Sequence, residues 1–231
     1  MTERINPRGD RRGGRIGLFG GSFNPAHAGH RYVAELARRR LRLSAVWLLV
    51  SPGNPLKPVA GMAPFAARLE SARAIADGRW IVASGIEAAL GTRYTADTLR
   101  RLRRRFPRAR FVWVMGADNL EQLGRWRQWR DIAGAIPFAV FPRPTYNHRA
   151  LASLAARRLR SGRRPERVAS ALAGMAPPAW VFLTAPQHAA SASAIRAARP
   201  GPPVGSTASS ESRLLHLRSP PPSRLAPPAN P

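Results

Sequence analysis

The chain has 231 residues and a formal net charge of +26, with 38 basic residues against 12 acidic ones. This length suits one α/β domain with a sizeable core. The absence of cysteine excludes a disulfide framework, a thiol nucleophile and a cysteine zinc site. Lys57 is the only lysine, and the wealth of arginine, alanine, proline and glycine is typical of a GC-rich coding bias. We therefore interpret the charge as a solvated basic surface that attracts phosphorylated substrates, and we do not expect nucleic acid as the main partner.

The apolar runs and the two ends of the chain indicate a cytoplasmic protein without a membrane partner. The longest apolar runs, such as residues 46–50, are far too short to cross a bilayer, and no apolar signal segment stands at the N-terminus. Residues 1–14 are rich in arginine and glycine, which predicts a mobile basic arm. Residues 200–231 are rich in proline and serine, which predicts a disordered tail. We expect a single domain over residues 15–199.

Short apolar runs alternate with helical patterns along this domain. Strands are predicted at residues 16–19, 45–50, 80–83, 110–115, 137–141 and 180–183. Helices are predicted at residues 28–40, 64–76, 95–105, 120–133, 150–160 and 190–198, and residues 161–167 predict a loop or weak helix. Pro64 suits a first helical turn, and Thr95 and Ser191 offer N-caps. The alternation predicts an α/β fold with a Rossmann-like doubly wound parallel sheet, which binds ligands at the carboxyl ends of its strands.

The densest group of glycine and polar residues follows the first predicted strand. Residues 20–30 read G-G-S-F-N-P-A-H-A-G-H. Glycines let backbone N–H groups approach a phosphate, and the next helix points its positive end at the same place. We expect His27 and His30 on one face of the first helical turn, where they donate to phosphate oxygens. Either histidine alone also fits a structural role, and because a zinc site needs a third ligand nearby, we expect no protein-bound metal.

This segment resembles the signature of the HxGH nucleotidylyltransferase superfamily, and its flanks are most similar to those of bacterial nicotinate-nucleotide adenylyltransferases. The resemblance implies adenylyl transfer from ATP to nicotinate mononucleotide, which yields deamido-NAD and pyrophosphate in NAD biosynthesis. It further implies direct in-line attack by the mononucleotide phosphate, with Mg²⁺ bridging the phosphates of ATP. In the family pattern His27, His30 and Arg196 stabilise the developing charge. The ATP contacts that this segment implies are Gly20, Gly21, Ser22 and Phe23.

Four later segments are similar to segments of the same family. Residues 54–57 resemble a loop with a basic residue near the substrate phosphate. Residues 92–99 resemble S-Y-T-x-D-T-L, with Arg93 in place of the usual serine. Residues 114–120, followed by Trp126, resemble a G-x-D…W arrangement. Residues 191–196 resemble S-S-T-x-I-R and depart from it at Ala192.

The resemblance implies a role for each of these segments. The implied contacts of the mononucleotide are Lys57, Tyr94, Thr95, Asp118 and Trp126, with Trp126 stacked on the pyridine ring. The implied further contacts of ATP are Gly116, Asp118, Ser191 and Ser193. A structural alternative stands beside each role: an exposed lysine, a capping box at Thr95, or a tryptophan in the core, which is the role we expect of Trp129.

Two other functions stay open from the sequence. A sibling adenylyltransferase that uses nicotinamide mononucleotide or pantetheine phosphate shares the histidine motif. A basic RNA-binding protein that keeps the fold without turnover belongs to a different class, and its binding would weaken steeply with salt. A homo-oligomer stays open as well.

Overall fold

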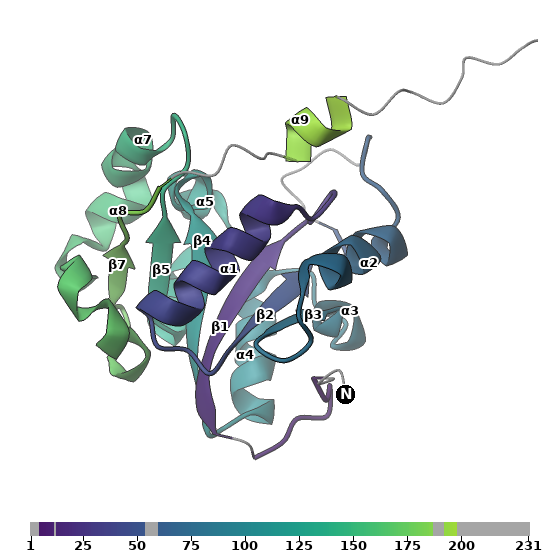
Figure 1. Ribbon diagram of the computed structural model, residues 1–231. Helices are drawn as coiled ribbons and strands as arrows, with labels where there is room; N and C mark the ends of the chain where they lie inside the picture. The colour runs from purple at the N-terminus through teal and green to yellow at the C-terminus, as the bar shows by residue number, and fades with distance from the viewer. Residues whose placement is uncertain (1–4, 12, 54–59, 187–191, 198–231) are drawn as a thin grey trace, which may run out of the picture. The chain divides into compact units, whose positions relative to one another are not determined.

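The computed structural model describes residues 5–11, 13–53, 60–186 and 192–197, and every structural statement below concerns these residues. In this part of the chain seven strands form one sheet in the order β3-β2-β1-β4-β5-β7-β6, and every neighbouring pair is parallel (Figure 1). The strands are β1 (Gly14–Gly21), β2 (Ala45–Val50), β3 (Ile81–Ser84), β4 (Ala109–Gly116), β5 (Phe138–Phe141), β6 (Arg163–Arg164) and β7 (Trp180–Phe182).

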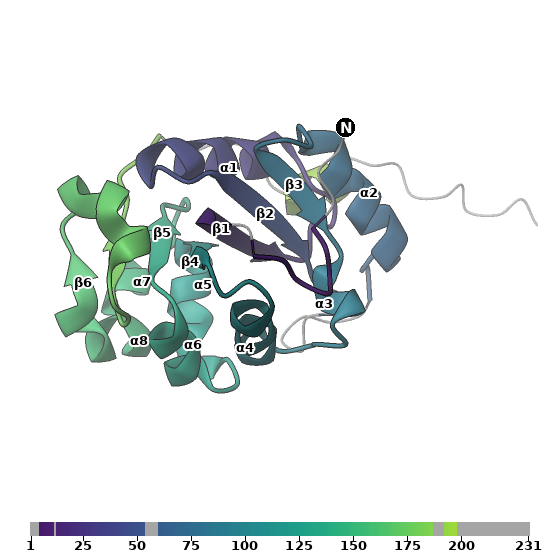
Figure 2. The same ribbon diagram turned by 90° about the horizontal axis from the view of Figure 1, so that it is seen from below.

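Helices flank both faces of the sheet, so the predicted doubly wound α/β fold is confirmed. The α-helices are α1 (Ala28–Arg40), α2 (Phe65–Ile75), α3 (Ile86–Ala89), α4 (Thr95–Arg105), α5 (Ala117–Gln122), α6 (Trp129–Ala135), α7 (Asn147–Ala152), α8 (Leu154–Arg158) and α9 (Ala192–Ala197). The 3-10 helices are η1 (Leu123–Arg125), η2 (Arg160–Gly162) and η3 (Glu166–Gly174). Helices α1 and α2 cover one face, and α4, α5 and α6 cover the other (Figure 2).

The core consists of two buried clusters, one on each face, and the strands feed them alternately. On β4, Val112 and Val114 enter the cluster under α1, whereas Trp113 and Met115 enter the cluster under α4 and α5. This follows from the period of two along a strand. A strand that is apolar on both faces is what a central position in a parallel sheet requires.

The predicted strands are confirmed within a few residues, whereas α3 and most of η3 were not predicted and three predicted helical features differ. The helix predicted over residues 120–133 is wrong, because Trp126 is extended and Gln128 has a left-handed φ of 54°, which separates α5 and η1 from α6. The helix predicted over residues 150–160 is split at Ser153, whose hydroxyl caps α8. Thr95 is the first residue of α4 and does not cap it. The two-residue strand β6 was not predicted, since two arginines carry no apolar signal.

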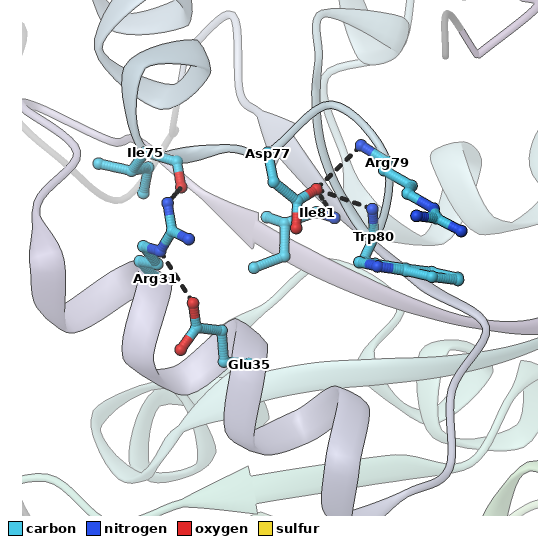
Figure 3. Close-up of polar contacts among 7 residues, drawn as sticks. All are labelled: Arg31, Glu35, Ile75, Asp77, Arg79, Trp80 and Ile81. Atoms are coloured by element: carbon cyan, nitrogen blue, oxygen red, sulfur yellow. Dashed lines mark hydrogen bonds and ion pairs between the residues drawn. The ribbon is translucent and has the colours of Figure 1, made fainter. Parts of the chain in front are cut away.

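The turn from α2 into β3 is organised by one carboxylate, that of Asp77. It accepts hydrogen bonds from the backbone N–H groups of Arg79, Trp80 and Ile81 at 2.9, 2.7 and 2.8 Å (Figure 3). Burial by itself raises the pKa of Asp77, but the three hydrogen bonds, with the positive charge of Arg31, outweigh it and lower the pKa. Within the described residues no helix is long and apolar enough to span a bilayer.

Candidate active site

A cavity of about 770 Å³ opens where β1, β2 and β4 end. Parallel strands present their carboxyl ends at one edge, so loops that are distant in sequence converge there. All the described residues that the sequence assigned to a substrate line this cavity. They are Gly20, Gly21, Ser22, Phe23, His27, His30, Tyr94, Thr95, Gly116, Asp118, Trp126, Ser193 and Arg196. Lys57 and Ser191 lie outside the described residues.

The two histidines form a capping box at the start of α1. His27 is the N-cap, and its Nδ1 accepts from the backbone N–H of Gly29 at 3.1 Å. His30 is the third residue of the helix, and its Nδ1 accepts from the backbone N–H of His27 at 3.3 Å. Because both Nδ1 atoms accept, each neutral ring carries its proton on Nε2. His27 therefore precedes the first turn, where we had expected it within that turn, and it still lies next to His30, with ring centroids 3.9 Å apart.

The glycine turn before α1 is shaped by aromatic rings. Phe23 adopts a left-handed φ of 48°, which brings its ring to 4.9 Å from that of His30. A Cβ at Gly21 would lie 3.1 Å from the Phe23 ring, and a Cβ at Gly20 would lie 2.5 Å from the ring of Trp113. Close approach thus requires glycine at position 20 and leaves little room for a side chain at position 21, a reason that adds to the backbone access a phosphate needs.

A buried arginine holds this turn against its neighbours. Arg68 on α2 is 3% exposed and donates to the carbonyl oxygens of Ser22 (2.8 Å), Ser51 (2.7 Å), Pro52 (3.1 Å) and Ala63 (2.9 Å). Burial lowers the pKa of Arg68, yet an arginine stays charged. Its fork of donors therefore fixes the loops after β1 and β2 and leaves a positive charge beneath the cavity.

The opposite wall is built around a buried glutamate. Glu87 on α3 is 7% exposed, and the Thr98 hydroxyl donates to its carboxyl at 3.1 Å. The same hydroxyl lies 2.9 Å from that of Thr92. Burial raises the pKa of Glu87 to about 7, and the hydrogen bond from Thr98 opposes this only in part. The network thus supports the segment that carries Tyr94 and Thr95 into the cavity.

Asp118 stands at the end of β4. Its carboxylate lies 3.4 Å from the guanidinium Nε of Arg143, and its Oδ1 is buried without a hydrogen bond. This Oδ1 is the atom that pairs with Arg143, and Asp118 lines the cavity.

Helix α9 reaches the glycine turn through Arg196. Its guanidinium donates to the carbonyl oxygen of Asn24 at 2.6 Å and to the Ser193 hydroxyl at 3.2 Å. The cavity lining as a whole is cationic. Its arginines are Arg93, Arg125, Arg127, Arg143 and Arg196, and its carboxylates are Glu87 and Asp118. Such a lining attracts polyanions. In the described part of the chain, no three histidine, aspartate or glutamate side chains group as a metal site requires.

Sequence reasoning missed four residues of the site: Arg68, Glu87, Trp113 and Arg143. Arg68 and Glu87 lie on helices, Trp113 lies on a strand and Arg143 lies in the loop after β5, and their convergence depends on the tertiary fold. A signal existed for Glu87, because a lone acidic residue shortly before the T-R-Y-T segment stands out in so basic a chain.

Comparisons with known proteins agree with this site. The model of the cytidylyltransferase-like family matches residues 18–198. A protein of Gluconacetobacter diazotrophicus is 60% identical over 189 residues, 82% of this chain and 88% of its own length. One of Gluconobacter oxydans is 58% identical over 182 residues, 79% and 93% of the two chains. Each carries the name "Probable nicotinate-nucleotide adenylyltransferase".

A solved structure shares the fold. The nicotinic acid mononucleotide adenylyltransferase of Plasmodium falciparum, complexed with NaAD, superposes with a TM-score of 0.59 at 16% identity. The match covers 79% of this chain and 82% of the other. The identity of the bacterial relatives and their coverage show more than the fold. This chain belongs to the cytidylyltransferase-like family and, within it, to the nicotinate-nucleotide adenylyltransferases.

Proposed function

We propose that this chain transfers the adenylyl group of ATP to nicotinate mononucleotide, forming deamido-NAD and releasing pyrophosphate. The observation that carries the proposal is that one cationic cavity gathers the glycine turn with its histidines, the Tyr94–Thr95 segment, Asp118 and Trp126. This combination provides for two phosphorylated substrates side by side. The names of the relatives at 58–60% identity support the same reaction.

The proposed chemistry is an in-line displacement at the α-phosphorus of ATP. A phosphate oxygen of the mononucleotide forms the new P–O bond while the bond to the bridging oxygen breaks, and pyrophosphate leaves with its charge. In this proposal the Nε2–H groups of His27 and His30, the N-terminus of α1 and Arg196 stabilise that charge. The divalent ion, Mg²⁺ in our proposal, arrives with ATP as part of the substrate and neutralises phosphate charge.

The substrates divide the cavity between them in this proposal. ATP lies on Gly20, Gly21, Ser22, Phe23, Gly116, Asp118, Ser191 and Ser193. The mononucleotide lies on Lys57, Tyr94, Thr95, Asp118 and Trp126. Stacking on the Trp126 ring, which lines the cavity from the extended segment between η1 and α6, suits a flat pyridine ring. A cytoplasmic location and a homo-oligomer remain predictions of the sequence.

The experiment that tests the function measures pyrophosphate release from ATP with each candidate co-substrate: nicotinate mononucleotide, nicotinamide mononucleotide and pantetheine phosphate. We expect the highest kcat/KM with nicotinate mononucleotide. Preference for either of the others would replace the proposal by the sibling activity. Release with none of them, together with strongly salt-dependent RNA binding, would favour the RNA-binding alternative.

A substitution in the histidine pair tests the mechanism. His30→Ala removes one charge-stabilising donor, and we expect a loss of about 10²–10³-fold in kcat. His148→Ala is the matched control, because His148 is exposed on α7 and does not line the cavity. Near-normal turnover by the folded His30→Ala protein would contradict the role proposed for His30.

A further inference from the structure

An exposed arginine, Arg127, joins the two segments that we assign to the mononucleotide. It follows Trp126 in the segment between η1 and α6, and both residues line the cavity. Its guanidinium carbon lies 4.7 Å from the centroid of the Tyr94 ring, which also lines the cavity. Stacking of this kind orients the guanidinium and leaves its N–H donors accessible at the edge. A positive charge is thus held between the Trp126 and Tyr94 segments.

A tight turn fixes Arg127 next to Trp126. The backbone N–H of Trp129 donates to the Trp126 carbonyl oxygen at 3.2 Å, and Gln128 within the turn has a left-handed φ of 54°. The Trp126 ring stands perpendicular to that of Trp113, with 6.5 Å between the ring centroids. The turn therefore presents a flat ring and a cation from neighbouring positions of the chain.

No carboxylate among the described residues pairs with Arg127. The two carboxylates of the cavity lining are engaged elsewhere. Asp118 pairs with Arg143, and Glu87 accepts from the Thr98 hydroxyl. Burial also raises the pKa of Glu87 to about 7, so this group carries only part of a negative charge at neutral pH. The charge of Arg127 is therefore available to an anionic ligand.

We propose that the Arg127 guanidinium pairs with the carboxylate of a nicotinate ring stacked on Trp126, and that Arg127 thereby sets the preference for nicotinate over nicotinamide mononucleotide. The inference rests on the proposed function. The two mononucleotides share the ribose phosphate and differ at one ring substituent, a carboxylate or a neutral amide. Cations that attract the phosphate act on both compounds alike, so discrimination by charge requires a cation beside the ring. Arg127 is a specificity-determining residue in this proposal.

The test measures the specificity ratio, which is kcat/KM with nicotinate mononucleotide divided by kcat/KM with nicotinamide mononucleotide. An exposed ion pair changes an equilibrium constant by up to about fivefold. We expect Arg127→Gln to lower the specificity ratio about three- to fivefold, through the nicotinate substrate alone. Arg130→Gln is the matched control, because Arg130 is exposed, stacks on the Trp129 ring at 5.5 Å and does not line the cavity. It should leave the specificity ratio unchanged.

Three results would overturn the inference. The first is an unchanged specificity ratio in Arg127→Gln. The second is an equal loss with both mononucleotides, which would place Arg127 at their common phosphate. The third is an equal fall of the ratio in Arg93→Gln, because Arg93 also lines the cavity and selection would then come from its overall positive charge.

Salt gives a second measurement that needs no substitution. Added salt screens the ring carboxylate from Arg127, whereas its effect on the phosphate is common to both mononucleotides and cancels in the ratio. We expect the specificity ratio of the unsubstituted chain to fall with salt, and that of Arg127→Gln to change less. A ratio that is independent of salt in the unsubstituted chain would refute the proposal. Failure of the proposed function is distinct, since it appears as absent turnover of that chain with either mononucleotide.

Discussion

Replacing Glu87 by glutamine removes a buried acid whose ionisation opposes stability at neutral pH. Glutamine keeps the oxygen that accepts from Thr98, so the network with the Thr98 hydroxyl persists. The pKa of Glu87 rises from the ordinary 4.5 to about 7 because burial disfavours the carboxylate. Each pKa unit corresponds to about 1.4 kcal/mol, so the ionised carboxylate costs the folded state about 3 kcal/mol.

The direction of the pH dependence follows from which state holds the proton. Below pH 4.5 both states are protonated, and burial of the neutral acid carries no penalty from ionisation. Between pH 4.5 and about 7 the unfolded chain ionises while the folded chain retains its proton, so the free energy of unfolding falls as the pH rises. Above about pH 7 both states are ionised, and the penalty stays constant.

The assay is urea unfolding between pH 4 and pH 8 for the unsubstituted chain, Glu87→Gln and Glu70→Gln. Glu70 pairs with Arg73 on α2 and its side chain is 67% exposed, so its replacement controls for the loss of one surface charge. We expect Glu87→Gln to gain stability over the unsubstituted chain as the pH rises, up to about 3 kcal/mol at pH 8. A constant difference across this range would refute the reasoning.

Three further substitutions, the last with a matched control, test other parts of the structure. Asp77→Ala removes the carboxylate that accepts from three backbone N–H groups and should cost about 1–2 kcal/mol in urea unfolding at pH 7. This loss of stability should shrink as the pH falls through the lowered pKa of Asp77, because the carboxylate of the unsubstituted chain is then protonated. Lysine in place of Arg68 cannot reach four carbonyl oxygens, so Arg68→Lys should cost about 2–4 kcal/mol in the same assay. An unchanged free energy of unfolding would contradict the role of Arg68 in holding the loops after β1 and β2. Gly20→Ala brings a Cβ into the ring of Trp113 and should reduce kcat/KM. The control is Gly134→Ala on α6, where a Cβ meets open space. It should leave kcat/KM unchanged and stabilise the helix by about 0.5–1 kcal/mol.

The parallel sheet was accessible from the sequence because its strands are short apolar runs separated by helical patterns. The central strands β1, β2 and β4 are buried on both faces, and such strands show the strongest signal. The break at Trp126 was not accessible, because residues 120–133 read as one helix when propensity alone is considered. A tertiary requirement, the presentation of Trp126 to the cavity, overrides that local preference.

The residues of the candidate site also divide into those that the sequence predicted and those that it did not. His27 was identifiable because it follows a predicted strand and a glycine turn, whereas the role of Asp118 was implied by the resemblance of residues 114–120 to the family. The sheet topology brings the two strand ends together. The sequence did not indicate the supporting residues, because nothing in the sequence distinguishes Arg68 from the other 37 basic residues. Its role depends on which carbonyl oxygens surround it, and only the folded chain shows these.

The capping box of His27 and His30 links the order of one helical turn to the binding of anions. Local unfolding of the first turn of α1 breaks both hydrogen bonds to Nδ1 and separates the two Nε2–H donors from each other. By linkage, an anion that binds only the closed turn suppresses its opening by about 2.7 kcal/mol when present at about a hundred times its Kd. Amide hydrogen exchange at Gly29 and His30 should then slow about a hundredfold on saturation with ATP. The end of a helix thus acts as a reporter of substrate occupancy.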